Sequence, residues 1–318
     1  MTEGFDILNS AIDDYIKSSN MIGEEDLILV SKLTDIILSN KEVYFDYKYD
    51  KKYSLKESDK IVKNFLSSLN PYYEEYYEMR KKDGTILFDH QPQTDESAFS
   101  SYDPIDNKRI IYIPLDNTLE DSFAIVHELM HDINLDISLI NQTRFAYTEG
   151  LSLLGELLLE DYLKERNVKQ YNNPTNKGLY SLKSKAIEVS LNLNLIKKYL
   201  IDGYINTANL LEILDLYPEN YADDLSITIY KITDSKELTL DEEQRYIIGG
   251  LIATYMYDRI KSNKYNLMEL FELNQMLKYY NFDQVLDYLD LDYNEIDLEP
   301  SAYKKLEEKY KKYLKSRW

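Results

Sequence analysis

The sequence predicts a mainly helical protein with one small β-sheet, and three observations support this fold class. Long stretches carry apolar residues at spacings of three and four with few glycines or prolines, which is the pattern of amphipathic helices. Two short runs rich in β-branched and aromatic residues, both next to turn signals, have the character of strands. With 318 residues, of which 44% are hydrophobic, the chain can bury a substantial core.

The first third of the chain is expected to be helical. Apolar positions recur at helical spacing near residues 5–18, 24–39 and 55–80. We find no internal repeat and no low-complexity linker that divides the chain cleanly. We therefore expect an N-terminal helical region at residues 1–82, followed by a second region with a C-terminal helical lobe at residues 83–318.

The predicted sheet is built from two runs. The segment Asp83–His90 has a turn followed by a short strand-like run, and a polar stretch from Gln91 to Asn107 follows it. The run Arg109–Ile113 is β-branched and aromatic and stops at Pro114, which has no N–H to donate to a neighbouring strand. We expect these two runs to form a small sheet beside the next helix.

The next helix is the most informative part of the chain. Asn117 and Thr118 are expected to cap it, and acidic residues fill its first turn, where the helix dipole favours negative charge. The segment Phe123–His131 is apolar nearly all round, which predicts a buried helix. A loop of about ten residues then leads to a second helix that begins near Gln142.

The rest of the chain is expected to be helical as well. An Asn-rich loop from Gln170 to Lys177 precedes further helices. The last clear segments are Thr239–Ile260, helices around 266–290 and a Lys-rich amphipathic tail that ends at Trp318. Thr239 begins a capping box.

The buried helix carries the motif His127-Glu128-Leu129-Met130-His131, in a chain with only three histidines. Residues at i and i+4 lie one above the other on a helix, so both imidazoles can bind one Zn²⁺ from the same face. Glu128 would then lie beside the ion, where it can take a proton from bound water. Buried polar groups need partners, and a metal ion would satisfy all three together.

A catalytic zinc site needs a third protein ligand and one open position. His90 is one candidate. The stronger candidate is Glu149, which shares a helix face with Ser152 and Glu156 in a Leu-rich segment. Glu149 would bind zinc, and Glu156 could orient a ligating histidine from behind.

Two glycines support packing of this second helix against the first. Gly150 and Gly155 each cost about 1 kcal/mol in a helix interior relative to Ala, and such residues often mark close contact with another helix. The alternative is that Glu149 and Glu156 are solvated charges on an amphipathic helix.

Composition excludes several classes of function. A net charge of −20 disfavours binding to nucleic acid or to an anionic membrane, and no apolar run approaches the length of a membrane span. There is no cysteine, which removes disulfides and thiolate chemistry, and the N-terminus has no secretory pattern. We expect a cytoplasmic protein whose oligomeric state the sequence leaves open.

The segment from Ile110 through Glu128 resembles the strand and helix entry of the oligoendopeptidase F and thimet-type oligopeptidases. The spacing of Glu149, Ser152 and Glu156 is similar to that family's second signature, whose first glutamate is the third zinc ligand. The segment Tyr246–Ala253 resembles the Gly- and Tyr-containing helix that closes their active site. The likeness covers roughly residues 105–165 and, more loosely, the region around this last helix.

The chain also departs from the family pattern, as a compact or distant member would. Met130 stands where the family has Gly, and Asn134 stands where it has a further His. The interval from His131 to Glu149 is shorter than usual, and the family's Tyr- and His-rich substrate loop is not evident.

The resemblance implies a zincin-like catalytic core and a zinc metalloendopeptidase that hydrolyses oligopeptides. One Zn²⁺ ion would be bound by His127, His131 and Glu149, with Glu128 as general base on a zinc-bound water. Residues 110–113 would act as an edge strand that pairs with the peptide substrate. Tyr246 and Tyr257 are candidates for the hydroxyl that stabilises the oxyanion.

Two alternatives stay open from the sequence. One is a regulatory zinc protease that cleaves a single protein partner, since such enzymes also place HExxH before an acidic, Leu-rich helix. The other is a non-catalytic helical protein with structural zinc, which would need a fourth ligand, either His90 or Glu156.

Overall fold

The computed structural model describes most of the first 262 residues. The described ranges are 2–17, 52–92, 97–103, 108–134, 142–166, 177–216, 222–238, 246–247, 249–250, 253, 256–257 and 259–262. The chain divides into two compact units. One contains α3 to α6 and the sheet, and the other contains α1, nearly all of α7, α8 and α9.

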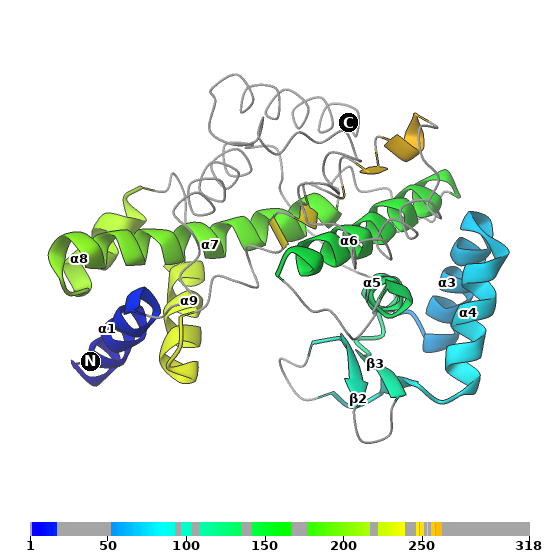
Figure 1. Ribbon diagram of the computed structural model, residues 1–318, viewed down its shortest axis with the longest axis horizontal. Coiled ribbons are helices and arrows are strands. Elements are labelled where there is room, and N and C mark those ends of the chain that lie inside the picture. Colours follow the sequence, from blue (N-terminus) through cyan, green and yellow to red (C-terminus); the bar gives the residue numbers. More distant parts are fainter. Residues whose placement is uncertain are drawn as a thin grey trace. The chain divides into compact units, whose positions relative to one another are not determined.

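A three-stranded sheet forms one side of the first unit (Figure 1). Its strands are β1 (Ile86–Asp89), β2 (Phe99–Asp103) and β3 (Lys108–Pro114), in the order β1-β3-β2. β3 pairs with β1 in parallel and with β2 in antiparallel orientation. The two expected strands are thus present, but β2 arises from the polar stretch in which we expected none. Because β3 is central, the expectation that residues 110–113 form an edge strand is wrong.

The period of β3 explains which face of the sheet is covered. Ile111 and Ile113 are buried, whereas Tyr112 between them is only half-buried. Successive side chains of a strand point to opposite faces, so the two isoleucines form the face that packs on the neighbouring helix. On the other face, Tyr112 stacks on Phe99 with ring centroids 5.2 Å apart.

Two helices replace the single helix expected near residues 55–80. They are α3 (Leu55–Leu69) and α4 (Pro71–Lys82). Asn70 separates them, because its backbone is extended and its side chain accepts a hydrogen bond from the N–H of Tyr72. Pro71 then occupies the first position of α4, where its missing N–H costs nothing. Helical periodicity continued across this junction, which is why the sequence pattern did not reveal the break.

The centre of this unit is the pair α5 (Glu120–Asn134) and α6 (Gln142–Glu165). α5 contacts β2 and β3 on one side and α6 on the other (Figure 1). The expected burial of α5 is confirmed, since its apolar residues from Phe123 to Met130 are almost fully covered except Ala124, which is half-buried. Gly155 allows the two helices to approach closely, because a Cβ there would lie 2.9 Å from Cγ of Met130.

The second unit is entirely helical within its described residues. Its helices are α1 (Thr2–Lys17), α7 (Lys177–Asp202), α8 (Thr207–Leu214) and α9 (Ala222–Ser235). α1 packs on α9. The buried side chain of Asn9 accepts a hydrogen bond from the N–H of Ile205 (2.6 Å) and donates one to its carbonyl (3.0 Å). This pair ties α1 to the turn between α7 and α8.

The fold class expected from the sequence is confirmed at the coarse level, as a mainly helical chain with one small sheet. The boundary expected after residue 82 stays a prediction; the compact units divide the chain elsewhere, with α3 and α4 in the unit of the sheet. The helices expected at 24–39 and 266–290, the capping box at Thr239 and the C-terminal tail lie outside the described residues. In the part of the chain that is described, no helix combines the length and apolar character needed to cross a membrane.

Candidate metal centre

α5 presents its two histidines on the face that meets α6. Thr118 helps to start this helix, because its hydroxyl accepts a hydrogen bond from the N–H of Glu120 (3.2 Å). His127 and His131 then lie one turn apart, with their Nε2 atoms 3.0 Å from each other. His127 is buried and His131 is half-buried. Two ring nitrogens are therefore directed at one point inside the unit.

α6 supplies a buried carboxylate at the same point. Oε1 of Glu149 is 3.3 Å from Nε2 of His131, and Oε2 is 3.6 Å from Nε2 of His127. The ligand atoms of the three residues lie within 4.8 Å of one another. Among the described residues, this group contains no fourth His, Cys, Asp or Glu. His127, His131 and Glu149 can therefore hold one metal ion.

Two observations test whether a zinc ion fits these residues. Four ligands at 2.0–2.1 Å from a tetrahedral ion are about 3.3 Å apart, and the three measured separations bracket this value. Oε2 of Glu149 is buried and has no hydrogen-bond partner among the described residues. A buried carboxylate oxygen without a partner is costly, and a cation bound between the side chains would satisfy it.

Glu156 contacts one of the histidines at the ring nitrogen that does not face Glu149. Its Oε1 is 2.7 Å from Nδ1 of His127, and both side chains are buried. This carboxylate accepts the Nδ1–H of the imidazole, so Nε2, which faces Glu149, is the ring nitrogen that could bind a metal ion. Glu156 comes two turns after Glu149 on α6, so one helix supplies both carboxylates.

Burial and the neighbouring charges shift the pKa values of the group in opposite directions. Burial disfavours charge on His127, but the carboxylates of Glu149 and Glu156 outweigh it and raise the pKa of the imidazole well above its usual value. Burial also raises the carboxyl pKa of Glu149, yet His131 and His127 overcome this and lower it below its ordinary range. Without an ion, the group thus favours an ionised Glu149 carboxylate beside a positively charged imidazole. A metal cation could supply this positive charge in place of the proton.

Glu128 is the buried acidic residue next to this group on α5. Burial raises the pKa of its carboxyl, and the positive charges of His127 and His131 reduce that effect. A carboxylate whose proton affinity is raised in this way can act as a general base near neutral pH. The charges of Glu149 and Glu156 also act on this carboxyl and raise its pKa further, as expected for a residue close to the group.

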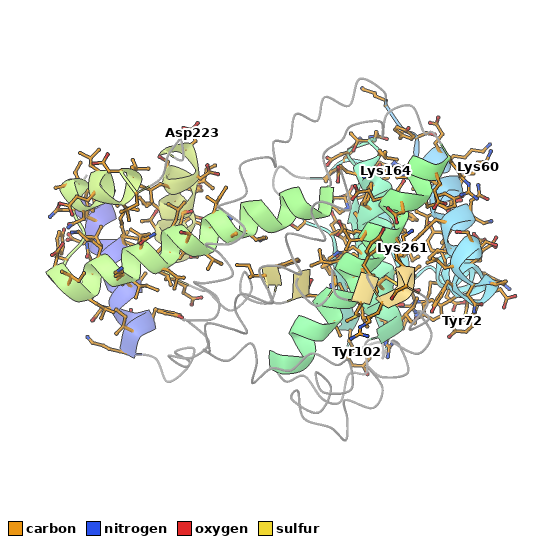
Figure 2. The ribbon with its side chains drawn as sticks, turned by 90° about the horizontal axis from the view of Figure 1, so that it is seen from above. Lys60, Tyr72, Tyr102, Lys164, Asp223 and Lys261 are labelled. Carbon is orange, nitrogen blue, oxygen red and sulfur yellow. The ribbon has the colours of Figure 1, made fainter. Side chains whose placement is uncertain are left out.

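The remaining candidate residues lie elsewhere. The hydroxyl of Tyr257 donates a hydrogen bond to Asp161, whose carboxylate is also 2.8 Å from the ammonium of Lys261. Lys261 is labelled in Figure 2. Asp161 is three turns beyond Glu149 on α6, or about 18 Å along the helix. The structure therefore does not bring Tyr257 to the three-residue group, and its role at the oxyanion stays a prediction.

Two further candidates are not part of the group either. Tyr246 belongs to the second compact unit, where its ring lies beneath the ammonium of Lys185 at 5.0 Å, and its expected role also stays a prediction. His90 is exposed at the end of β1 and is not among the residues that converge.

Sequence reasoning missed Asp132 and Arg80, a buried ion pair next to His131. The available signal was an aspartate placed inside an apolar helix directly after the second histidine of the motif. Nothing in the sequence named its partner, because Arg80 is 52 residues away.

Comparisons with known proteins show which solved structures share the fold of this chain. No model of a known protein family matches the sequence, and no curated protein matches it. Two solved structures do match: a peptidase by provisional assignment from Chlamydophila abortus (17% identity, TM-score 0.53) and an oligoendopeptidase F by provisional assignment from Bacillus anthracis str. Ames (13%, 0.52). Each match covers 99% of this chain, which spans 55% and 56% of theirs. The similarity shows that the chain shares the fold of part of these two proteins.

Proposed function

We propose that this protein is a zinc metallopeptidase that hydrolyses oligopeptides, with a catalytic core of the zincin type. The observation that carries the proposal is the convergence of His127, His131 and Glu149 from two packed helices, with Glu128 beside them. The provisional assignments of the two structural neighbours as peptidases support the same class.

The protein residues would divide the chemistry as follows. A zinc ion, when bound, would polarise the scissile carbonyl and lower the pKa of a water molecule. The Glu128 carboxylate would accept the proton of the attacking water and deliver it to the leaving amine. Glu156 would hold His127 in the tautomer that offers Nε2 to the ion.

The peptide backbone would pair with the sheet at β2. Among the described residues, β2 pairs only with β3, and it is the outer strand that contacts α5. Its free edge would bind an extended peptide through main-chain hydrogen bonds. The substrate would thus pair with β2 and not, as the sequence suggested, with residues 110–113.

A closed structural zinc site receives less support than an open catalytic one. A structural site needs four protein ligands, and the described part of the chain brings three together. Of the two candidates for a fourth ligand, Glu156 binds Nδ1 of His127 instead, and His90 lies outside the group. Three ligands leave a position for water or substrate.

Replacement of Glu128 by Gln tests the proposal. The amide cannot accept the proton, so we expect hydrolysis of a fluorogenic peptide to fall by about 10²- to 10⁴-fold while zinc stays bound. The matched control is Glu120→Gln, which changes an acidic residue two turns earlier on the same helix and should leave the rate unchanged. Hydrolysis by Glu128→Gln at the wild-type rate would refute the mechanism.

A peptide library separates a broad oligopeptidase from a regulatory enzyme with one protein substrate. We expect cleavage of many short peptides by the wild type and of none by Glu128→Gln. Cleavage of almost no peptide, with zinc bound stoichiometrically, would favour the regulatory enzyme instead.

A further inference from the structure

Asp132, the residue directly after His131, is held by an arginine from another helix. Its side chain is fully buried. Nε of Arg80 is 2.7 Å from Oδ2, and Nη2 of Arg80 donates to Oδ1 at 3.0 Å. The hydroxyl of Tyr76, one turn before Arg80 on α4, donates to Oδ2 at 2.7 Å. The carboxylate therefore accepts two hydrogen bonds and forms an ion pair, all with residues on one face of α4.

The backbone of the same turn is held as well. Nη2 of Arg80 also donates to the carbonyl of Arg109 on β3 (2.8 Å), and Nη1 of Arg109 donates to the carbonyl of Asp132 (2.7 Å). The last turn of α5 thus bonds to α4 through its side chain and to β3 through its main chain. Every one of these bonds involves a charged partner, which makes them stronger and more directional than neutral ones.

The two histidines differ in how they are oriented. His127 donates its Nδ1–H to Glu156, so a side-chain bond fixes its ring. For His131, the only contacts recorded within the described part of the chain are those with His127 and Glu149, the other members of the metal-binding group. The placement of its ring therefore depends on the placement of the backbone turn that carries it.

We infer that Arg80 is a positioning residue of the metal centre: by binding Asp132, it fixes the last turn of α5 and with it the imidazole of His131. This inference rests on the proposed function, because it assumes that His131 binds a metal ion. The recorded polar contacts of Arg80 are with Asp132 and Arg109, and none is with the three residues that could hold the ion. Arg80 acts through Asp132, with Tyr76 as a third member of the cluster.

The test replaces the charged pair by apolar residues of similar size, in Arg80→Met/Asp132→Leu. Buried ion pairs can often be exchanged for apolar side chains without loss of the fold, whereas removing one partner strands a buried charge. Far-ultraviolet circular dichroism checks the fold. Zn²⁺ affinity is measured by competition with a chromophoric chelator, and the visible spectrum of the Co²⁺-loaded protein reports ligand geometry.

We expect the double variant to bind Zn²⁺ about 10- to 100-fold more weakly than the wild type, the range found when groups behind metal ligands are changed. Its Co²⁺ spectrum should differ from that of the wild type. Tyr76→Phe removes one hydrogen-bond donor to Asp132 and should weaken Zn²⁺ binding by a few-fold. If the double variant does not fold, this single variant tests whether the cluster around Asp132 positions His131.

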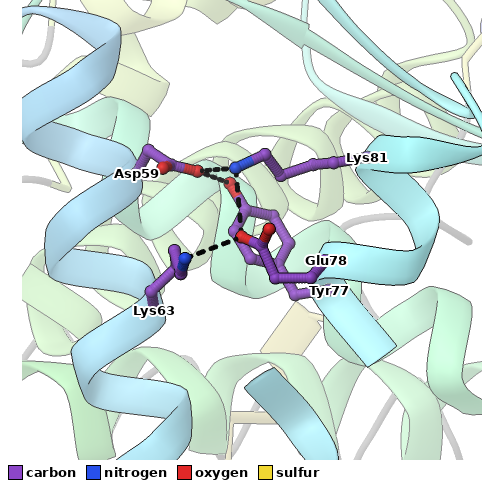
Figure 3. A network of polar contacts seen from close by, with 5 residues as sticks. All are labelled: Asp59, Lys63, Tyr77, Glu78 and Lys81. Atoms are coloured by element: carbon purple, nitrogen blue, oxygen red, sulfur yellow. Dashed lines mark hydrogen bonds and ion pairs between the residues drawn. The ribbon is translucent and has the colours of Figure 1, made fainter. Parts of the chain in front are cut away.

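The control is a neighbouring polar cluster on α3 and α4 that has no recorded bond to α5 (Figure 3). In it, Asp59 accepts hydrogen bonds from Lys81 and Tyr77, and Glu78 pairs with Lys63 and Lys81. Lys81→Met/Asp59→Leu should leave Zn²⁺ affinity and the Co²⁺ spectrum unchanged.

Three results would overturn the inference. Affinity and spectrum equal to the wild type in the folded double variant and in Tyr76→Phe would show that the arginine does not position the ligand. An equal loss in the control variant would show a general effect of helix stability. Failure of the wild type itself to bind Zn²⁺ would refute the proposed function as well, so the two failures are distinguishable.

Discussion

His127 lies between two carboxylates of one helix, and each serves a different ring nitrogen. Glu149 faces Nε2 at 3.6 Å, and Glu156 binds Nδ1 at 2.7 Å. Seven residues separate the two glutamates on α6, or two helical turns, so they lie on one face of the helix. A single helix can therefore provide both a ligand and the group that orients another ligand.

Replacement of Glu156 should weaken metal binding without changing the ligands. We expect Glu156→Ala to raise the Kd for Zn²⁺ by about 10- to 100-fold, and Glu156→Gln, which keeps an acceptor for Nδ1–H, to raise it less. Competition with a chelator measures both values. Glu165→Ala, an exposed position at the end of the same helix, is the control. An unchanged Kd in Glu156→Ala would show that His127 does not need this partner.

At the start of α5, Asp121 is a buried carboxyl that is not part of the metal group. It accepts a hydrogen bond from the N–H of Asp116 (3.0 Å), while its Oδ2 has no hydrogen-bond partner among the described residues. Burial raises its pKa from 3.8 to about 6, and the nearby Asp116 charge adds to this. The folded protein thus binds this proton more tightly than the unfolded chain does.

This difference predicts a pH-dependent contribution to stability. Because the folded state holds the proton, the contribution is present below the unfolded pKa and is lost as pH rises through the folded value near 6. Between pH 5 and 7, the free energy of unfolding of the wild type should fall relative to Asp121→Asn, by on the order of 1 kcal/mol. Urea unfolding at several pH values measures it. A difference that does not vary with pH would contradict the raised pKa.

The residues of the site were largely accessible from the sequence, because a helical motif fixes its own geometry. The spacing of His127 and His131, and of Glu149 and Glu156, places each pair on one helix face whatever the rest of the fold does. Arg80 was not accessible, since its contact with Asp132 depends on how α4 packs against α5. For the tyrosines, 31 copies offered many candidates and no local rule to choose among them.

At the scale of elements, the site depends on the close approach of α5 and α6. Gly155 on α6 provides the space that Met130 of α5 occupies. A Cβ at Gly155 would lie 2.9 Å from Cγ of Met130 and 3.1 Å from Cγ1 of Val126. Both contacts are shorter than van der Waals distance, so the side chains of Met130 and Val126, or the helices themselves, would have to shift.

Gly155→Ala should therefore destabilise the protein despite the better helix propensity of Ala. We expect a loss of about 1–2 kcal/mol in the free energy of unfolding, from overpacking of 1–3 kcal/mol offset in part by propensity. In a Met130→Ala background, the same change should be neutral or stabilising. Gly4→Ala, at a helical position with open space around it, is the control and should not destabilise. An equal cost in both backgrounds would contradict the proposed packing.

The sheet and the first helices show where sequence patterns fall short. β3 was predictable because β-branched and aromatic residues dominate it, whereas β2 contains Ser100, Ser101 and Asp103 and depends on pairing with β3 for its conformation. The break at Asn70 was hidden because helical spacing continues on both sides of it. Pairing with β3 determines the conformation of β2, and the cap residue Asn70 determines where α3 ends and α4 begins.

At the scale of the molecule, the candidate metal centre lies within one compact unit. α5, α6, α4 and the sheet all belong to that unit, so every contact described for the site is internal to it. The chain spans 55% and 56% of the two proteins whose fold it shares. The proposed catalytic elements are thus present in a chain much shorter than those proteins.

The central claim is that a metal ion is held by two histidines of α5 and one glutamate of α6. Metal content of the purified wild type, Glu149→Ala and the control Glu165→Ala, measured by mass spectrometry, tests it most directly. We predict one zinc ion per chain in the wild type and the control, and little or none in Glu149→Ala, because two ligands hold zinc far more weakly than three. Stoichiometric zinc in Glu149→Ala would contradict the account and would place the third ligand elsewhere.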